Sequence, residues 1–302
     1  MATPELPVLA EHLAEPAELE RSARAWTELG GNLLRSKKGM TGAILVGLAI
    51  FVAIFAPLIS PASPTEQVVS LLYASPSGSH PFGGDDLGRD VLARTLYGAR
   101  VSIAIGLLCV AIASLVGTVM GAIAGYVGGI AELVIMRLVD FQLAFPFILL
   151  AFIFLAIFGP GFWSIVVALC FALWVNYARV VRGETLKLRE LEFVQASRTI
   201  GASRSRILRQ HVLPNALHAV IVLATLDLGF VIIFESSLTF LGLGVRPPTP
   251  TWGGMIAEGR DFLSQSPWMT LFPGVALMLT VIGVNLFGDF LRDHLDPSLR
   301  IR

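Results

Sequence analysis

The most polar long loop of the chain reads LKLRELEFVQASRTIGASRSRILRQHVLPN, residues 186–215. It holds six basic side chains, those of Lys187, Arg189, Arg198, Arg204, Arg206 and Arg209. Apolar residues recur at roughly helical spacing before and after Gly201, which predicts two short helices separated by a break. Glycine adopts a positive φ at no steric cost, so Gly201 is placed to end the first helix. We expect Ser203 to cap the second helix and Pro214 to stop it.

The composition of the chain is that of a membrane protein. Of its 302 residues, 55% are hydrophobic and 15% are charged, with a mean hydropathy of +0.74. Soluble domains carry about 25% charged residues. The formal net charge is zero, and no broad basic surface is predicted, which argues against a nucleic-acid partner.

Six apolar runs are long enough to cross a bilayer, which requires roughly 20 residues. The sequence therefore predicts an all-α, polytopic membrane protein. The predicted transmembrane helices are residues 40–59, 101–127, 133–158, 162–181, 216–241 and 271–290. Gly159-Pro160-Gly161 forms a turn between the third and fourth.

Lysine and arginine predict the orientation, because they accumulate in cytoplasmic loops. Most of the basic residues fall before residue 40, in the central loop and its flanks, or at the C-terminus. We therefore expect both termini to be cytoplasmic. Residues 1–39 would form a cytoplasmic tail, and residues 40–98 the first span and an external segment. Residues 99–302 would form the core, with the other five spans and a central loop at residues 184–215.

Small residues repeat along the second predicted span. Ala113, Gly117, Gly121 and Gly125 recur every fourth residue and therefore share one helix face. In lipid, close approach of helix backbones supplies much of the packing. We expect this face to hold a neighbouring helix, and a lipid-facing helix with incidental glycines is the alternative.

Two long segments predicted outside the membrane contain candidate functional residues. These are Asp86, Arg89 and Asp90 in the first segment and Pro248 and Trp252 in the second. They could shape an external gate or contact a binding protein. Asp85, Asp86 and Asp90 could hold a cation by their number of carboxylates. Helix capping and ion pairing are favoured over a metal site, since their spacing is not that of a calcium loop. For the second segment, packing over the ends of the spans is an equal alternative.

Three acidic residues fall within predicted spans. Asp140 follows Arg137 by one helical turn, so the two could neutralise each other. Asp227 and Glu235 lie in the fifth span. Charged groups in a bilayer usually face protein or water. Asp140, Asp227 and Glu235 could therefore line a translocation path, although hydrogen bonding between helices explains them slightly better.

The central loop carries a family resemblance. Gln195-Ala196-Ser197, followed by Gly201, Ala202 and Leu213-Pro214, resembles the "EAA" loop of permease subunits in ATP-binding-cassette (ABC) importers. Two departures are Gln195, where the family pattern has glutamate, and His211, where it often has isoleucine. The resemblance implies a cytoplasmic coupling helix that docks into a cleft on the ATPase subunit. The alternative is a basic loop that only fixes topology.

The rest of the chain narrows this resemblance. Three further stretches look like the C-type permease of dipeptide, oligopeptide, nickel and glutathione importers. They are residues 80–90, residues 241–244 with the prolines that follow, and residues 288–297. The similarity covers nearly everything after residue 40. It implies the fold of a type I ABC importer permease in a bacterial plasma membrane. It also implies a heterodimer with a B-type permease, two ATPase subunits and an extracytoplasmic substrate-binding protein.

The predicted function is ATP-driven peptide import by alternating access, with no catalytic chemistry in this chain. No phosphate-binding loop of the form G-x-x-x-x-G-K-[ST] occurs, so ATP and Mg²⁺ are expected on the partner subunits. No cofactor or metal is expected in this chain. Nickel or glutathione import is one alternative. Another is a secondary transporter that uses Asp140, Asp227 or Glu235 as ion carriers. A membrane enzyme has little support, since no nucleophile or metal-ligand spacing stands out.

Overall fold

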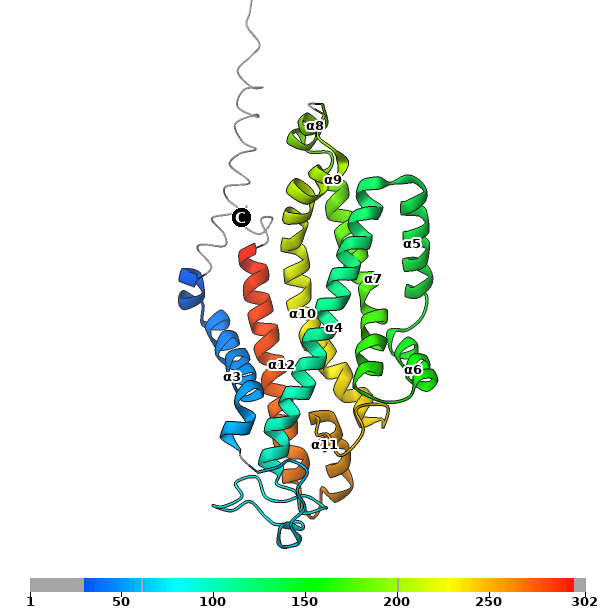
Figure 1. Cartoon of the computed structure of the whole chain (residues 1–302). Helices are drawn as coiled ribbons and strands as arrows, with labels where there is room; N and C mark the ends of the chain where they lie inside the picture. Colours follow the sequence, from blue (N-terminus) through cyan, green and yellow to red (C-terminus); the bar gives the residue numbers. More distant parts are fainter. Residues whose placement is uncertain (1–29, 61, 200, 296–302) are drawn as a thin grey trace, which may run out of the picture.

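The computed structural model of the protein describes residues 30–60, 62–199 and 201–295. The first 29 residues of the predicted tail and the last two residues of the 288–297 motif lie outside these ranges. Within them the chain forms helices joined by loops, which confirms the all-α prediction (Figure 1). The elements are α3 (Lys37–Ile59), η1 (Val69–Leu71), α4 (Val91–Val127), α5 (Gly129–Leu143), α6 (Phe147–Phe158), α7 (Phe162–Leu188), α8 (Glu192–Thr199), α9 (Arg204–Ile207), the π-helix η2 (Leu208–Val212), α10 (Leu213–Phe240), α11 (Trp252–Gly259), η3 (Arg260–Phe262) and α12 (Trp268–Leu295).

Five helices are long and apolar enough to cross a membrane, namely α3, α4, α7, α10 with η2, and α12. They match the first, second, fourth, fifth and sixth predicted spans. The helix α4 begins at Val91, ahead of the predicted residue 101. The helix starts earlier because Asp90 is its N-cap residue. The Asp90 side chain accepts a hydrogen bond from the Ala93 N–H at 2.8 Å.

The third predicted span is not a single straight helix. It is split into α5 and α6, which are bent by 90° at the break between them. Pro146 is the cause, since proline has no N–H and disfavours helical backbone at the residue before it. Its φ and ψ of −57° and 131° place it just ahead of α6. The correct description of this stretch is a bent pair of helices.

The small-residue face of α4 packs on α7, as predicted. A Cβ atom on Gly117 would lie 2.5 Å from the Trp174 carbonyl oxygen, and one on Gly121 would lie 2.4 Å from the Ala178 carbonyl oxygen. These distances are below van der Waals contact, so only glycine allows the two backbones to approach this closely. The pair α4 and α7 is therefore the rigid centre of the bundle.

The two ends of the bundle differ (Figure 1). The short helix α8 protrudes at one end, and the start of α3 and the end of α12 lie toward that same end. The loop formed by residues 62–90 covers the other end together with α11. Counting α5 with α6 as one bent span, six spans connect the ends. An even number of spans brings both ends of the described chain to the side of α8.

Candidate functional site

The central polar loop folds into an elbow, defined here as residues 189–212, which contains α8, α9 and η2. In α8, Val194 is fully buried, whereas Gln195 and Ala196 are exposed. Ser197 is half-buried, and its hydroxyl donates to the Phe193 carbonyl oxygen at 2.8 Å. Thus α8 packs on the bundle with one face and exposes Gln195 and Ala196 on the other.

Gly201 ends α8 in the predicted way. Its φ is +86°, in the region that favours glycine. The Gly201 N–H donates to the Arg198 carbonyl oxygen and the Ala202 N–H to the Ser197 carbonyl oxygen, both at 3.0 Å. This pair of bonds is the Schellman motif, which satisfies carbonyl groups that a helix end leaves free. The next helix starts at Arg204, directly after Ser203, as the sequence predicted.

Pro214 does not stop the second helix of the elbow, which corrects the prediction. It lies in the first turn of α10, and α9, η2 and α10 follow one another without a break. Proline in a helix crowds the carbonyl group four residues earlier and removes a donor. The wider turn of the π-helix relieves this, with the Leu213 N–H donating to the Leu208 carbonyl oxygen five residues earlier.

Two arginines fasten the elbow to the end of α4. The Arg189 guanidinium donates to the Gly125 carbonyl oxygen at 3.1 Å, in the last turn of α4, where a cation is favoured. The Arg198 guanidinium lies 5.2 Å from the centre of the Tyr126 ring. Tyr126 is also part of a buried cluster with Val194, Ile207 and Val212. The elbow is therefore held by α4 as well as by its covalent neighbours α7 and α10.

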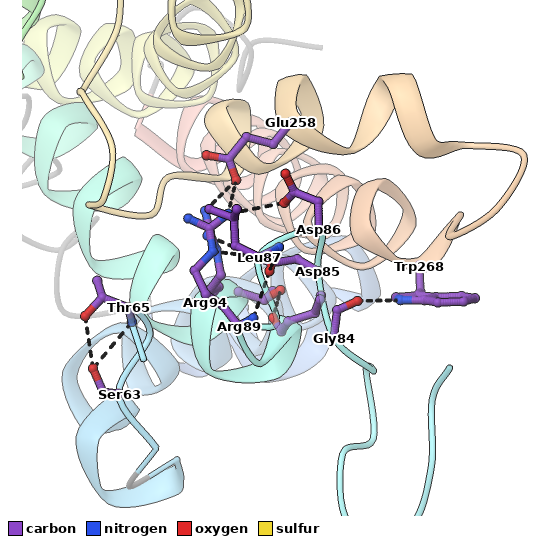
Figure 2. A network of polar contacts seen from close by, with 12 residues as sticks. Ser63, Thr65, Gly84, Asp85, Asp86, Leu87, Arg89, Arg94, Glu258 and Trp268 are labelled. Carbon is purple, nitrogen blue, oxygen red and sulfur yellow. Dashed lines mark hydrogen bonds and ion pairs between the residues drawn. The ribbon is translucent and has the colours of Figure 1, made fainter. Parts of the chain in front are cut away.

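At the other end, residues 62–90 and α11 form a cap held by an ion-pair network (Figure 2). Asp85 accepts from Arg89 Nε at 2.6 Å and from Arg94 Nη1 at 3.0 Å. Glu258 of α11 accepts from Arg89 Nη2 at 2.9 Å and from Arg94 Nη2 at 2.7 Å. Asp85, Arg89 and Arg94 are almost completely buried. The network joins the cap loop, the start of α4 and α11.

The cap network holds more negative than positive groups. Asp86 lies 3.5 Å from Arg89, so three carboxylates share two guanidiniums. Burial raises the pKa of the Glu258 carboxyl despite the opposing charge of Arg89. Burial and the charge of Asp85 raise the pKa of the Asp86 carboxyl. The ion pairing predicted from the sequence is confirmed, because the two guanidiniums lie among these carboxylates.

The remaining candidate residues at this end of the bundle have structural roles or are exposed. Asp90 caps α4, and its second oxygen lies 2.7 Å from His80 Nδ1. Trp252 is 2% exposed, and its indole N–H donates to the Thr95 carbonyl oxygen of α4 at 3.0 Å. It packs over the ends of the spans, the alternative considered from sequence. Pro248 is exposed.

The three acidic residues of the spans lie in different environments. Asp140 is exposed and pairs with Arg179 of α7 at 3.2 Å, so its partner is not the predicted Arg137. One Asp227 carboxylate oxygen is buried without a hydrogen bond from the described residues. Glu235 is fully buried and accepts from the Thr239 hydroxyl at 2.9 Å. Their assignment to a translocation path stays a prediction.

Comparison with known proteins identifies this arrangement of helices. Residues 117–301 match the family described as "Binding-protein-dependent transport system inner membrane component". The chain belongs to this family. Residues 24–76 also match the "N-terminal TM domain of oligopeptide transport permease C". As a member of the binding-protein-dependent family, the protein is a multi-pass membrane permease of an ABC transporter and a transport component rather than an enzyme.

Relatives of this permease match along nearly their whole length. The dipeptide transport system permease protein DppC of Alkalihalophilus pseudofirmus is 41% identical over 285 residues, 94% of each chain. The oligopeptide transport system permease protein OppC of Bacillus subtilis is 39% identical over 93% of this chain and 92% of its own. The glutathione transport system permease protein GsiD of Pectobacterium atrosepticum is 39% identical over 94% of this chain and 95% of its own.

A solved structure supports the fold of the permease. A chain of the MetNI methionine ABC transporter, in inward-facing conformations, matches with a TM-score of 0.53 and 21% identity. The match covers 68% of this chain and 96% of that one. It confirms the fold of an ABC importer permease.

Sequence reasoning missed three residues of these sites. Arg94 and Glu258 are partners in the cap network, and Arg179 is the partner of Asp140. Arg94 and Glu258 are 164 positions apart, so no local pattern relates them. Arg94 itself indicates that a buried ion-pair partner is needed, because it is a charged residue one turn into a helix that continues as an apolar span.

Proposed function

We propose that this permease is the C-type subunit of an ABC importer whose cargo is di- or oligopeptides. Relatives named for dipeptide and oligopeptide transport support this cargo, at 41% and 39% identity along almost the entire chain. The glutathione relative is similarly close, so glutathione is the second candidate. Measuring which peptides the cognate binding protein retains separates the two.

In the proposed complex, this chain pairs with a B-type permease above two ATPase subunits, and a binding protein delivers the peptide from outside. ATP and Mg²⁺ are held by the ATPase subunits, since this chain has no phosphate-binding loop. Both termini and the elbow face the cytoplasm. The cap then faces outward, where the binding protein would dock.

The elbow is the observation that carries this proposal. It protrudes from the end of the bundle where the described chain begins and ends (Figure 1), and it exposes Gln195 and Ala196 on α8. Its buried face is fixed to α4 through Tyr126 and Arg189. Closure of the ATPase dimer would move α8, and the packed helices would follow as rigid bodies, because close-packed interfaces shift between discrete arrangements.

Transport by the reconstituted complex tests this function. Lipid vesicles that contain this chain, the B-type permease and the ATPase subunits should accumulate a labelled dipeptide. Uptake should require ATP on the elbow side and the liganded binding protein on the cap side. A proton gradient without ATP should give no uptake, because the acidic residues of the spans are not the energy source. Uptake driven by the gradient alone would contradict the proposal and favour a secondary transporter.

A further inference from the structure

Helix α4 connects the two functional ends of the molecule without a break. It has 37 residues, which corresponds to about 55 Å at 1.5 Å per residue. No proline interrupts α4, whereas α3 contains Pro57 and α12 contains Pro273. Sharp kinks in helices arise mostly at proline, so α4 lacks the commonest cause of a kink. A displacement at one end of α4 is therefore carried to the other.

Each end of α4 is anchored by specific contacts. At the cap end, Arg94 bridges Asp85 of the cap loop and Glu258 of α11. At the elbow end, the Tyr126 ring lies under the Arg198 guanidinium of α8, and the Gly125 carbonyl oxygen accepts from Arg189. A shift of α8 must therefore pull on α4, and a shift of α4 must pull on α11.

The half of α4 nearer the elbow is held against sliding. A Cβ atom on Gly121 would lie 2.4 Å from the Ala178 carbonyl oxygen of α7, and one on Gly125 would lie 2.7 Å from Thr185 Cβ. The two backbones interlock at these points, so α4 and α7 move as one body. This packing leaves tilting of the α4 and α7 pair as the way to transmit motion.

We propose that α4 relays the state of the cap to the elbow, with Arg94 and Tyr126 as the positioning residues at its two ends. The inference rests on the proposed function, in which the liganded binding protein docks on the cap and the ATPase subunits dock on α8. Docking on the cap then changes the ion pair between Glu258 and Arg94 and so tilts α4. The tilt moves Tyr126 and, through its ring, the Arg198 guanidinium on α8. Because linkage between binding equilibria is reciprocal, nucleotide binding that shifts α8 alters the affinity of the cap for the binding protein by the same route.

Helix α10 is a competing route that is separate from the α4 and α7 pair. It continues directly from the elbow, and a Cβ atom on Gly253 of α11 would lie 2.4 Å from the Ser236 carbonyl oxygen of α10. However, α10 meets the elbow through the π-helix η2, a local irregularity of the helix. Its contact with α11 is one of close packing, whereas α4 holds α11 by ion pairs. Mutational coupling between the two ends of α4 can separate these routes.

The test measures how strongly saturating liganded binding protein stimulates ATP hydrolysis by the reconstituted complex. Glu258→Gln removes the ion pair between α4 and α11. Trp252 keeps its hydrogen bond to the Thr95 carbonyl oxygen and Arg94 keeps Asp85 as a partner, so the cap stays folded. Tyr126→Leu keeps an apolar side chain in the buried cluster but removes the ring under Arg198. Asp261→Asn is the control, since this nearby acidic residue pairs only with Arg260 in the described chain.

If α4 is the relay, each of the two variants lowers maximal stimulation by about fivefold, the lower range of measured coupling between sites. Maximal stimulation in the double variant is then also about fivefold lower than in the wild type. The two contacts act in series, so the second substitution has no further effect once the first has interrupted the relay. The half-saturating concentration of binding protein changes little, and Asp261→Asn behaves as wild type.

Three results would overturn the relay. The first is a loss of maximal stimulation of about 25-fold in the double variant, since effects that multiply indicate independent routes such as α10. The second is normal stimulation in both single variants. The third is an equal loss in Asp261→Asn. A wild-type complex that neither hydrolyses ATP nor imports peptide would instead contradict the proposed function itself, so the two failures are distinguishable.

Discussion

Replacing Gly201 by valine is expected to uncouple ATP hydrolysis from peptide uptake. The φ of Gly201 is +86°, and a positive φ costs an L-residue about 1–3 kcal/mol, most of all a β-branched one. The chain would escape this cost by leaving the Schellman motif, which re-aims α8 relative to α9. We expect uptake to fall about tenfold, equivalent to about 1.4 kcal/mol, while the ATPase subunits still hydrolyse ATP.

Gly183→Val is the matched control for this experiment. A Cβ atom on either Gly183 or Gly201 would meet nothing within 4 Å, but only Gly201 has a positive φ. The two variants therefore differ in backbone strain and not in crowding. Membrane insertion of both should be normal in a protease-protection assay. Wild-type ratios of peptide imported to ATP hydrolysed in Gly201→Val would remove the elbow from the coupling mechanism.

Replacing Gly121 by leucine is expected to prevent assembly of the bundle. Its Cβ atom would lie 2.4 Å from the Ala178 carbonyl oxygen, and backbone atoms cannot move aside as a flexible side chain can. Overpacking of a close-packed core costs about 1–3 kcal/mol, and more where the backbone must shift. We expect a large drop in the yield of folded complex and in its melting temperature in detergent.

Gly47→Leu in α3 provides the comparison. It introduces the same side chain into another span, at a position where a Cβ atom would meet nothing within 4 Å. This variant should express and melt like the wild type. Equal yields and melting temperatures for Gly121→Leu and Gly47→Leu would show that α4 and α7 do not depend on the close approach described above.

Local features of the structure could be predicted from the sequence. The Schellman motif at Gly201 and the α4 face around Gly121 depend on residues within a few positions of each other. Glycine and helical periodicity identify such features, because backbone geometry alone decides them. The same holds for the second predicted span, which corresponds to α4 apart from the earlier start of the helix at Val91.

Features set by contacts between distant segments, or by competing local effects, could not be predicted. Glu258 meets Arg94 only because α11 folds back over the start of α4. Asp140 pairs with Arg179 because α7 runs beside α5, and this contact prevailed over the nearer Arg137. The break between α5 and α6 at Pro146 is not evident from hydropathy, because the apolar run continues through the proline. Pro214 is the opposite case, because a π-helix accommodates a proline that the sequence predicts to end the helix.

The central claim is that α8 transmits movement from an ATPase subunit to the spans. The most direct test places a photo-crosslinking amino acid at Gln195, which is exposed on α8, and a second one at Leu263, which is 52% exposed beyond η3 at the cap. The probe at position 195 should form adducts with the ATPase subunit in the assembled complex, in a yield that changes with bound nucleotide. The probe at position 263 should form none. Absence of ATPase adducts at position 195, or their formation at position 263, would contradict the account.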